Sequence, residues 1–184
     1  MPKDIYIQMN TDFLTPIHTV LEESLDMLLP GTLGNSIKIH TQKNGFPDLN
    51  TIEIAILGVD EDRNTDGNFG SGKDLHHIRN HFYKLFPGNW NVPIADLGNV
   101  KKGESTSDTH FAVTEVIKNL LKMNIIPIII GGGQDITFSN YKAYDQLEQT
   151  VNLVVVDSKF DLGNLEDKLS SKSYLSKIIM EVPT

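Results

Sequence analysis

Apolar residues recur along this chain at two alternating periods, one typical of helices and one typical of strands. Spacings of three and four predict four helices, and a Pro-Gly pair follows each of the first two. These helices are expected at residues 17–28, 75–85, 111–121 and 136–147. Ser107 or Asp108 is placed to cap the third helix, because short polar side chains accept hydrogen bonds from free N–H groups at helix starts.

Short apolar runs between these helices predict strands. The runs lie at residues 52–57, 92–97, 125–130 and 151–156. The last two are almost continuously apolar, which is typical of strands buried on both faces of a parallel sheet. Pro127 suggests that regular pairing in the third strand begins after it, since proline donates no ladder hydrogen bond. Residues 37–42 are a candidate for an additional edge strand.

The order of these elements predicts an α/β domain with a mainly parallel sheet and right-handed crossovers. No linker, repeat or low-complexity tract divides the 184 residues, so a single domain is expected over residues 1–184.

Composition narrows the class of protein further. The formal net charge is -8 and no basic block occurs, which argues against a nucleic-acid partner. No apolar run is long enough to span a membrane, and the N-terminus has no apolar core of signal-peptide length. The absence of cysteine excludes disulfides, thiolate zinc sites and a cysteine nucleophile. We therefore expect a soluble, cytoplasmic domain.

Polar side chains gather where three of the predicted strands end. Asp60 follows the first strand, residues 131–135 follow the third, and residues 157–161 follow the fourth. Because the carboxyl ends of parallel strands share one edge of a sheet, these segments are expected to converge where α/β proteins bind ligands.

The chemistry of these strand ends has more than one interpretation. Asp157 and Asp161 could hold a hard cation, or they could bond backbone amides and cap a turn. Lys159 between them could neutralise both acids and make a metal unnecessary. Gly131–Gly133 could expose a helix N-terminus to an anion, or could simply permit a tight connection from strand to helix.

Two of these segments resemble motifs of the ureohydrolase family, which comprises arginase, agmatinase and formimidoylglutamase. Residues 131–135 resemble the family's Gly-Gly-Asp-His-Ser motif, and residues 157–161 resemble its Asp-Ala-His-x-Asp motif. The glycine-rich segment 58–79 and Asp96-Leu97-Gly98 are similar to further family segments. The likeness covers roughly residues 50–162 and is greatest for the formimidoylglutamase branch.

The resemblance implies a three-layer α-β-α fold and a site at which two Mn²⁺ ions activate water to cleave a C–N bond of a guanidine or amidine. In this sequence Gln134 and Lys159 stand at the two histidine positions of the motifs. Asp157 and Asp161 match the family as remnant ligands of doubtful occupancy. No Ser-x-Asp-x-Asp motif follows Asp161, and family domains are longer. We therefore expect the N-terminal part of a longer domain, with a sheet incomplete toward its C-terminus.

These observations lead to three hypotheses. The first is an arginase-like domain with a degenerate metal centre, no cofactor, and a structural, regulatory or ligand-binding role, in which Lys159 is the counter-ion of Asp157 and Asp161. The second is a manganese-dependent hydrolase of linear amidines, active in the full-length protein. The third is a module that binds a small anionic ligand at a rim formed by Asp60, Gly131, Gly132, Gly133 and Asp135. Homo-oligomerisation is expected by resemblance.

Overall fold

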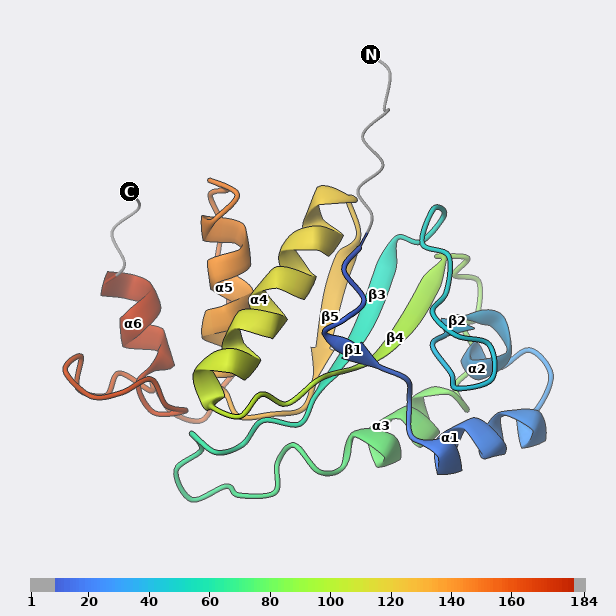
Figure 1. The fold of residues 1–184 in the computed structure, drawn as a ribbon, viewed down its shortest axis with the longest axis horizontal. Helices are drawn as coiled ribbons and strands as arrows, with labels where there is room; N and C mark the ends of the chain where they lie inside the picture. Colours follow the sequence, from blue (N-terminus) through green and yellow to red (C-terminus); the bar gives the residue numbers. More distant parts are fainter. Residues whose placement is uncertain (1–8, 181–184) are drawn as a thin grey trace, which may run out of the picture.

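The computed structural model describes residues 9–180, which form a five-stranded, mainly parallel sheet (Figure 1). β3 (Ile54–Val59) is central and pairs in parallel with β4 (Ile94–Val100) and β5 (Ile126–Ile130). Beyond β4 lie β1 (Leu14–Thr15), which is antiparallel to it, and β2 (Lys38–Ile39), which is parallel to it. β2 confirms the edge strand expected within 37–42, whereas β1 is too short to be recognised from periodicity.

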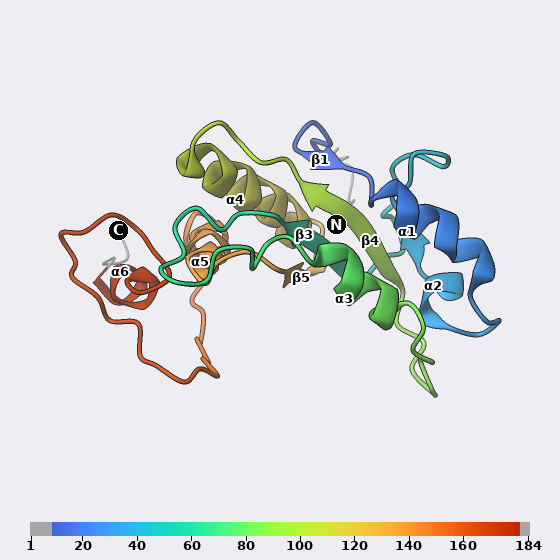
Figure 2. The same ribbon diagram turned by 90° about the horizontal axis from the view of Figure 1, so that it is seen from below.

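The helices cover both faces of this sheet. They are α1 (Thr19–Ser24), the short 3₁₀ helix η1 (Leu25–Met27), α2 (Leu33–Ser36), α3 (Leu75–Phe82), α4 (Thr106–Lys122), α5 (Ile136–Asp145) and α6 (Tyr174–Met180). α4 lies on one face with α5 packed beside it, and α3 with α1 lies on the other (Figure 2). The expected three-layer α/β architecture is confirmed. No helix among residues 9–180 is long and apolar enough to cross a bilayer.

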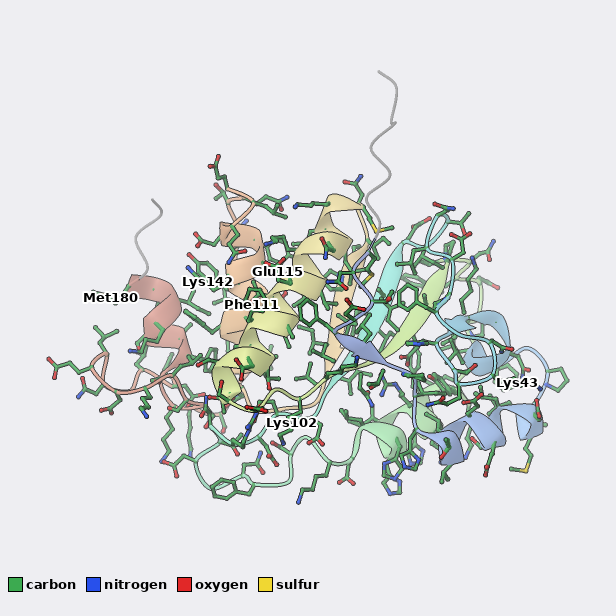
Figure 3. The ribbon with its side chains drawn as sticks, viewed as in Figure 1. Lys43, Lys102, Phe111, Glu115, Lys142 and Met180 are labelled. Carbon is green, nitrogen blue, oxygen red and sulfur yellow. The ribbon has the colours of Figure 1, made fainter. Side chains whose placement is uncertain are left out.

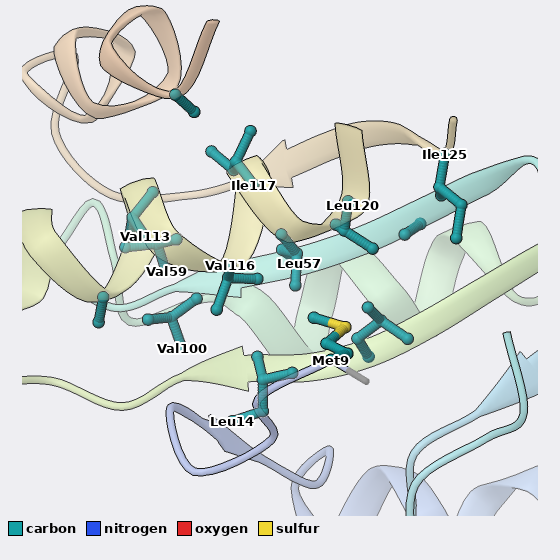
Figure 4. Close-up of a cluster of buried hydrophobic side chains, with 14 of the residues drawn as sticks. Met9, Leu14, Leu57, Val59, Val100, Val113, Val116, Ile117, Leu120 and Ile125 are labelled. Carbon is teal, nitrogen blue, oxygen red and sulfur yellow. The ribbon is translucent and has the colours of Figure 1, made fainter. Parts of the chain in front are cut away.

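The main hydrophobic core lies between α4 and the sheet (Figure 4). Val113, Val116 and Leu120 of α4 are fully buried against Leu57 and Val59 of β3. The α4 residues recur at helical spacing and the β3 residues at a spacing of two, so each element turns one apolar face inward. This agreement between periodicity and packing explains why the existence and type of α4 and β3 could be predicted from sequence.

α4 begins at Thr106, five residues before the start of the predicted range. Ser105, and neither Ser107 nor Asp108, is the N-cap, and the backbone N–H of Asp108 donates to its hydroxyl at 3.2 Å. The Asp108 carboxylate in turn accepts the Ser105 N–H at 2.8 Å. This reciprocal capping box satisfies two free backbone donors, so the helix begins before its apolar face does.

Two predictions about the last strands are wrong. Residues 151–156 form no strand and are exposed throughout, with Val154 86% and Val156 98% exposed. β5 is not buried on both faces, since Ile126 is 61% and Ile128 is 45% exposed. A continuous apolar run indicates that a segment needs a covering partner, but it does not identify that partner. Within residues 9–180 the side chains of residues 151–156 stay exposed, and β5 is covered by α4 on one face only.

Pro127 lies inside β5, opposite Ala55, so the expectation that pairing begins after it is also wrong. The N–H of Ile126 donates to Glu53 of the neighbouring chain segment at 2.8 Å. Because successive N–H groups of a strand point to opposite sides, the nitrogen of Pro127 faces the outer edge of the sheet. Proline therefore costs no hydrogen bond to β3.

A buried ion pair fixes α3 to β4. Arg79 Nε donates to Asp96 Oδ2 at 2.7 Å, and both side chains are almost completely buried. The Tyr83 hydroxyl donates to the same carboxylate at 2.8 Å. Burial, together with the charge of Asp96, raises the pKa of Tyr83, so the hydroxyl remains a donor over the whole stability range of the protein.

Removing the cation should be far more damaging than removing the hydroxyl. We expect Arg79→Met to lower the free energy of unfolding by about 3–5 kcal/mol, because Asp96 is left charged and unpaired in the interior. Tyr83→Phe should cost roughly 1.5–3 kcal/mol, since Asp96 keeps its guanidinium partner. Urea unfolding followed by circular dichroism measures both. Equal losses for the two variants would contradict the assignment.

Candidate functional site

The loops that follow β3, β4 and β5 meet at the lower edge of the sheet in Figure 1, as expected for parallel strands. The backbone N–H of Gly133, after β5, donates to the Glu61 carbonyl, after β3, at 2.7 Å. The Arg63 guanidinium donates to the carbonyls of Gly103 and Glu104, after β4, at 3.0 and 2.6 Å. The predicted convergence is therefore confirmed for the segments after β3 and β5, and the loop after β4, which was not among the predicted polar strand ends, joins them.

Glu61 and Arg63 form the electrostatic centre of this edge. The Glu61 side chain is fully buried, and Arg63 Nε donates to its Oε1 at 2.9 Å. Burial alone would raise the pKa of Glu61, but the hydrogen bonds from the Arg63 side chain and backbone outweigh it and lower the pKa to about 2. Lys102, labelled at this edge in Figure 3, lies 3.8 Å from Asp62.

Gly131 and Gly132 turn the chain out of β5 with φ angles of +80° and +83°. This left-handed conformation is strained for other residues. A Cβ at Gly132 would also lie 3.1 Å from the Glu61 carbonyl, so the β3 loop and the glycine turn are closely packed. The turn and the start of α5 line an open cavity of about 350 Å³, which includes Gln134 and Asn140.

The start of α5 does not resemble an anion site. The N–H groups of Ile136, Thr137 and Phe138 already donate to the carbonyls three residues before them, at 3.0 to 3.1 Å. The Asp135 carboxylate, completely buried, lies at the N-cap position. An added anion would meet occupied donors and a negative charge, so the geometry favours the tight-connection interpretation of the glycine run.

Asp135 belongs to a polar contact that the sequence did not reveal. His110 of α4 places Nε2 2.9 Å from Asp135 Oδ2 and Nδ1 2.5 Å from the Ser139 hydroxyl. The order resembles a Ser-His-Asp triad, but Ser139 is only 1% exposed, so its hydroxyl cannot reach a substrate. The contact ties α4 to α5. His110 shares the helix face of Val113 and Ile117, and that position could have marked it as an inward-facing residue.

Gln134 and Asp157, 23 residues apart in sequence, are brought into direct contact. The Gln134 side-chain amide donates to Asp157 Oδ2, and the backbone N–H of Lys159 donates to Oδ1 of the same carboxylate at 3.3 Å. Asp161, with φ +39°, faces Asp157. The residues at the motif positions therefore lie together even though residues 151–156 form no strand.

The two acids titrate differently. Slight desolvation opposes ionisation of Asp157, but hydrogen bonds from Lys159 and Gln134 prevail and lower its pKa. Desolvation and the adjacent Asp157 carboxylate raise the pKa of Asp161, and the charge of Lys159 partly offsets that rise. Within residues 9–180 the Lys159 ammonium forms no direct ion pair, so its influence on Asp161 acts through space.

Asp60 is separated from these residues. It lines a smaller cavity of about 160 Å³ on the α3 side of the sheet, with His76, Arg79 and Asn99. Its Oδ1 atom is buried without a hydrogen-bond partner among the described residues, and the nearest cation, Lys102 Nζ, lies 3.9 Å away. The structure thus does not assemble Asp60 and Gly131–Gly133 into one ligand pocket.

The fold defines an α/β protein. Its polar loops cluster at the carboxyl ends of the parallel strands, where such proteins bind ligands. A protein-family model described as the arginase family matches residues 52–182. This chain therefore belongs to the arginase family.

Individual relatives agree with that assignment. The chain is 31% identical over 120 residues to a formimidoylglutamase of Macrococcus caseolyticus, a match that covers 62% of this chain and 38% of the relative. Among solved structures it is similar to a formiminoglutamase of Trypanosoma cruzi, crystallised with manganese, with a TM-score of 0.66 and 21% identity over 72% of this chain. The formimidoylglutamase of Bacillus subtilis gives a TM-score of 0.65 and 20% identity over 74% of this chain. The matches cover 49% and 46% of those two structures.

The chain thus spans well under two thirds of its relatives' length. Among residues 9–180 no group of three or more histidine and carboxylate side chains could hold a metal ion. The amide N–H of Gln134 points at Asp157, where a ligand would instead have to direct an oxygen at a cation. Lys159, at the other histidine position, is a cation itself.

Stability should depend on Glu61 in strongly acidic solution. Its folded-state pKa of about 2 is lower than the 4.5 of an unperturbed glutamate, so its contribution is complete above about pH 4.5. The contribution falls as the pH drops toward 2, on the order of 3 kcal/mol in total. We expect Glu61→Gln to flatten the fall in unfolding free energy between pH 4.5 and 2. A profile parallel to that of the unsubstituted protein would contradict the role of Glu61.

The coupling of the two motif acids can be measured directly. We expect Asp157→Asn to lower the pKa of Asp161, because a neighbouring negative charge is removed, and Lys159→Met to raise it, because a positive charge is removed. Carboxyl-carbon NMR titration of Asp161 reads both shifts. Lys168→Met, on the same exposed loop, is the matched control. Shifts of the same sign in the two test variants would refute the arrangement.

Proposed function

We propose that this arginase-family chain does not build a dimanganese centre and that its role is structural, regulatory or ligand-binding. The observation that carries the proposal is the hydrogen bond from the Gln134 amide to Asp157. It places a neutral donor against one carboxylate of the motif pair and occupies an oxygen that a metal ion would need.

Electrostatics at the second motif position supports the same proposal. At an effective dielectric constant of 20, a unit charge and a dication about 4 Å apart repel by roughly 8 kcal/mol. An ion between Asp157 and Asp161 would lie in the field of Lys159, whose charge already offsets part of the rise in the pKa of Asp161. A lysine there supplies positive charge to the acid pair without a metal.

A small amidine is the ligand class we propose, with the cavity beside Gln134 as its site. The lining of that cavity offers an amide, a hydroxyl and backbone groups from Gln134, Thr137 and Asn140, which suit a polar ligand of modest size. We also propose a cytoplasmic location, since the chain lacks cysteine and carries a net charge of -8.

Manganese binding tests the proposal. We expect equilibrium dialysis of the purified chain to show no stoichiometric Mn²⁺, and addition of Mn²⁺ to produce no hydrolysis of formimidoylglutamate. The double variant Gln134→His/Lys159→His should bind Mn²⁺ at least tenfold more tightly, because it gains two imidazole ligands and loses the ammonium. The same double variant with Asp157→Asn should lose that gain.

Near-stoichiometric manganese in the unsubstituted protein, abolished by Asp157→Asn, would overturn the proposal. It would favour the second candidate, a metal-dependent hydrolase of C–N bonds in linear amidines. The formimidoylglutamases to which this chain is similar make that the activity to assay first.

A further inference from the structure

The smaller cavity, of about 160 Å³, lies on the α3 face of the sheet and is lined mainly by polar side chains. We call it the α3 cavity. Helices α1 and α3, which lie next to each other on this face (Figure 2), line it together with the glycine-rich loop after β3 and the end of β4. Gln134 and the motif acids are not among its lining residues, so it is separate from the cavity beside Gln134. Its polar lining comes from His18, Asp60, Lys73, His76, Arg79 and Asn99.

Two opposite charges at the α3 cavity lack a close partner. Asp60 Oδ1 is buried and accepts no hydrogen bond within residues 9–180. Its nearest cation, Lys102 Nζ, lies 3.9 Å away and is shared with Asp62 at 3.8 Å. Among the same residues the Lys73 ammonium forms no hydrogen bond and no ion pair, with Asp60 or with any other group. A buried acceptor without a donor costs free energy, which a bound donor would recover.

Uncharged hydrogen-bond donors line the same cavity. His18 is the N-cap of α1, and its Nδ1 atom accepts the Val20 N–H at 3.3 Å. In a neutral imidazole this places the ring proton on Nε2, which is then a donor. Asn99 Oδ1 accepts from Arg79 Nη1 at 2.6 Å, so the amide nitrogen of Asn99 is the group that remains for a ligand. Together with the Lys73 ammonium, these donors suit a carboxylate.

The size of the α3 cavity limits what can bind there. One water molecule occupies about 30 Å³ in the liquid, so a volume of 160 Å³ accommodates on the order of five or six non-hydrogen atoms. Gly72 closes one side, because a Cβ at this position would lie 2.8 Å from Asp60 Oδ1. The smallest amino acids have this size, whereas formimidoylglutamate is considerably longer and does not fit.

We propose that the α3 cavity binds a small zwitterion of the size of glycine or alanine. The ammonium group of the ligand donates to Asp60 Oδ1, and its carboxylate accepts from Lys73, His18 and Asn99. One molecule thereby gives a partner to each of the two unpaired charges. The site uses no motif residue and no metal ion, so it stands whether or not the proposed function holds.

Glycine and L-alanine are the probes, and acetate and methylammonium are the control ligands that carry only one of the two charges. Each is titrated into the full chain in EDTA. We expect both amino acids to shift the backbone amide NMR signals of Gly72 and Asn99 until saturation. They should also raise the melting temperature, because a ligand that binds only the folded state stabilises it. Acetate and methylammonium should bind at least tenfold more weakly, since each leaves one charge unpaired.

Two variants test the two ends of the ligand separately. Asp60→Asn and Lys73→Met should each weaken glycine binding at least tenfold, because each removes one of the charges that the zwitterion pairs with. Asp66→Asn, in the same loop as Asp60, and Lys84→Met, just after α3, are the matched controls. Both control positions are exposed and outside the cavity lining, so glycine binding should be unchanged. Unaltered circular dichroism of each variant shows that folding is retained.

Three results would each overturn the inference. They are the absence of a saturable shift with either amino acid, binding of acetate or methylammonium as tight as that of glycine, and glycine binding indifferent to both test variants. Because every measurement is made in EDTA, none of these results depends on manganese. A failure of this inference is therefore distinguishable from a failure of the proposed function.

Discussion

The buried Arg79–Asp96 pair is the constraint on which the arrangement of this domain depends. A charge placed in the interior is tolerated only with a partner, so α3 can occupy just one position on β4. Arg79 also donates to the Gly98 carbonyl and to Asn99, so the same side chain fixes the end of β4. The loop after β4 therefore begins at a fixed position. In that loop the carbonyls of Gly103 and Glu104 accept hydrogen bonds from Arg63, which follows β3.

The carboxyl edge repeats this principle with different chemistry. Glu61 is buried because Arg63 accompanies it, and Asp135 is buried beside His110. The motif acids are the exception, since Asp157 and Asp161 face each other near the surface and are compensated by the Gln134 amide, the backbone N–H of Lys159 and more distant lysine charges. At this edge Gln134 and Lys159, the two residues expected at histidine positions by resemblance, lie beside Asp157 and act on the motif acids.

Sequence patterns predicted the parts of the fold whose cause is local. The apolar faces of α4 and β3 have their helix and strand periods, and each is buried on the expected side. The strand-end pattern predicted that residues 131–135 and 157–161 share one edge, and the structure brings Gln134 and Asp157 together there although residues 151–156 form no strand. The structure bears out the fold and the family, whereas the roles of Asp157, Asp161, Gln134 and Lys159 remain predictions.

The failures have a common physical origin in partners that are distant in sequence. Residues 151–156 have the composition of a buried strand, yet strand formation requires a neighbour that residues 9–180 do not supply. The helix face of His110 could have marked it as inward-facing, but its partners could not be read from the sequence because Asp135 and Ser139 lie 25 and 29 residues further along the chain. Asp60 was grouped with the glycine turn since both follow strands, but the two lie beside different cavities.

Pro127 gives β5 a selectivity that an ordinary strand would lack. The ring nitrogen of Pro127 faces the edge of β5 that is unpaired within residues 9–180, so this edge lacks one backbone N–H donor that a non-specifically pairing strand would need. Two copies of this protein that paired through their β5 edges with the two Pro127 residues opposite each other would lose hydrogen bonds of the strand ladder, because neither proline has an N–H to donate. A strand whose register spares that position loses nothing, and the proline therefore acts as a gatekeeper against self-aggregation.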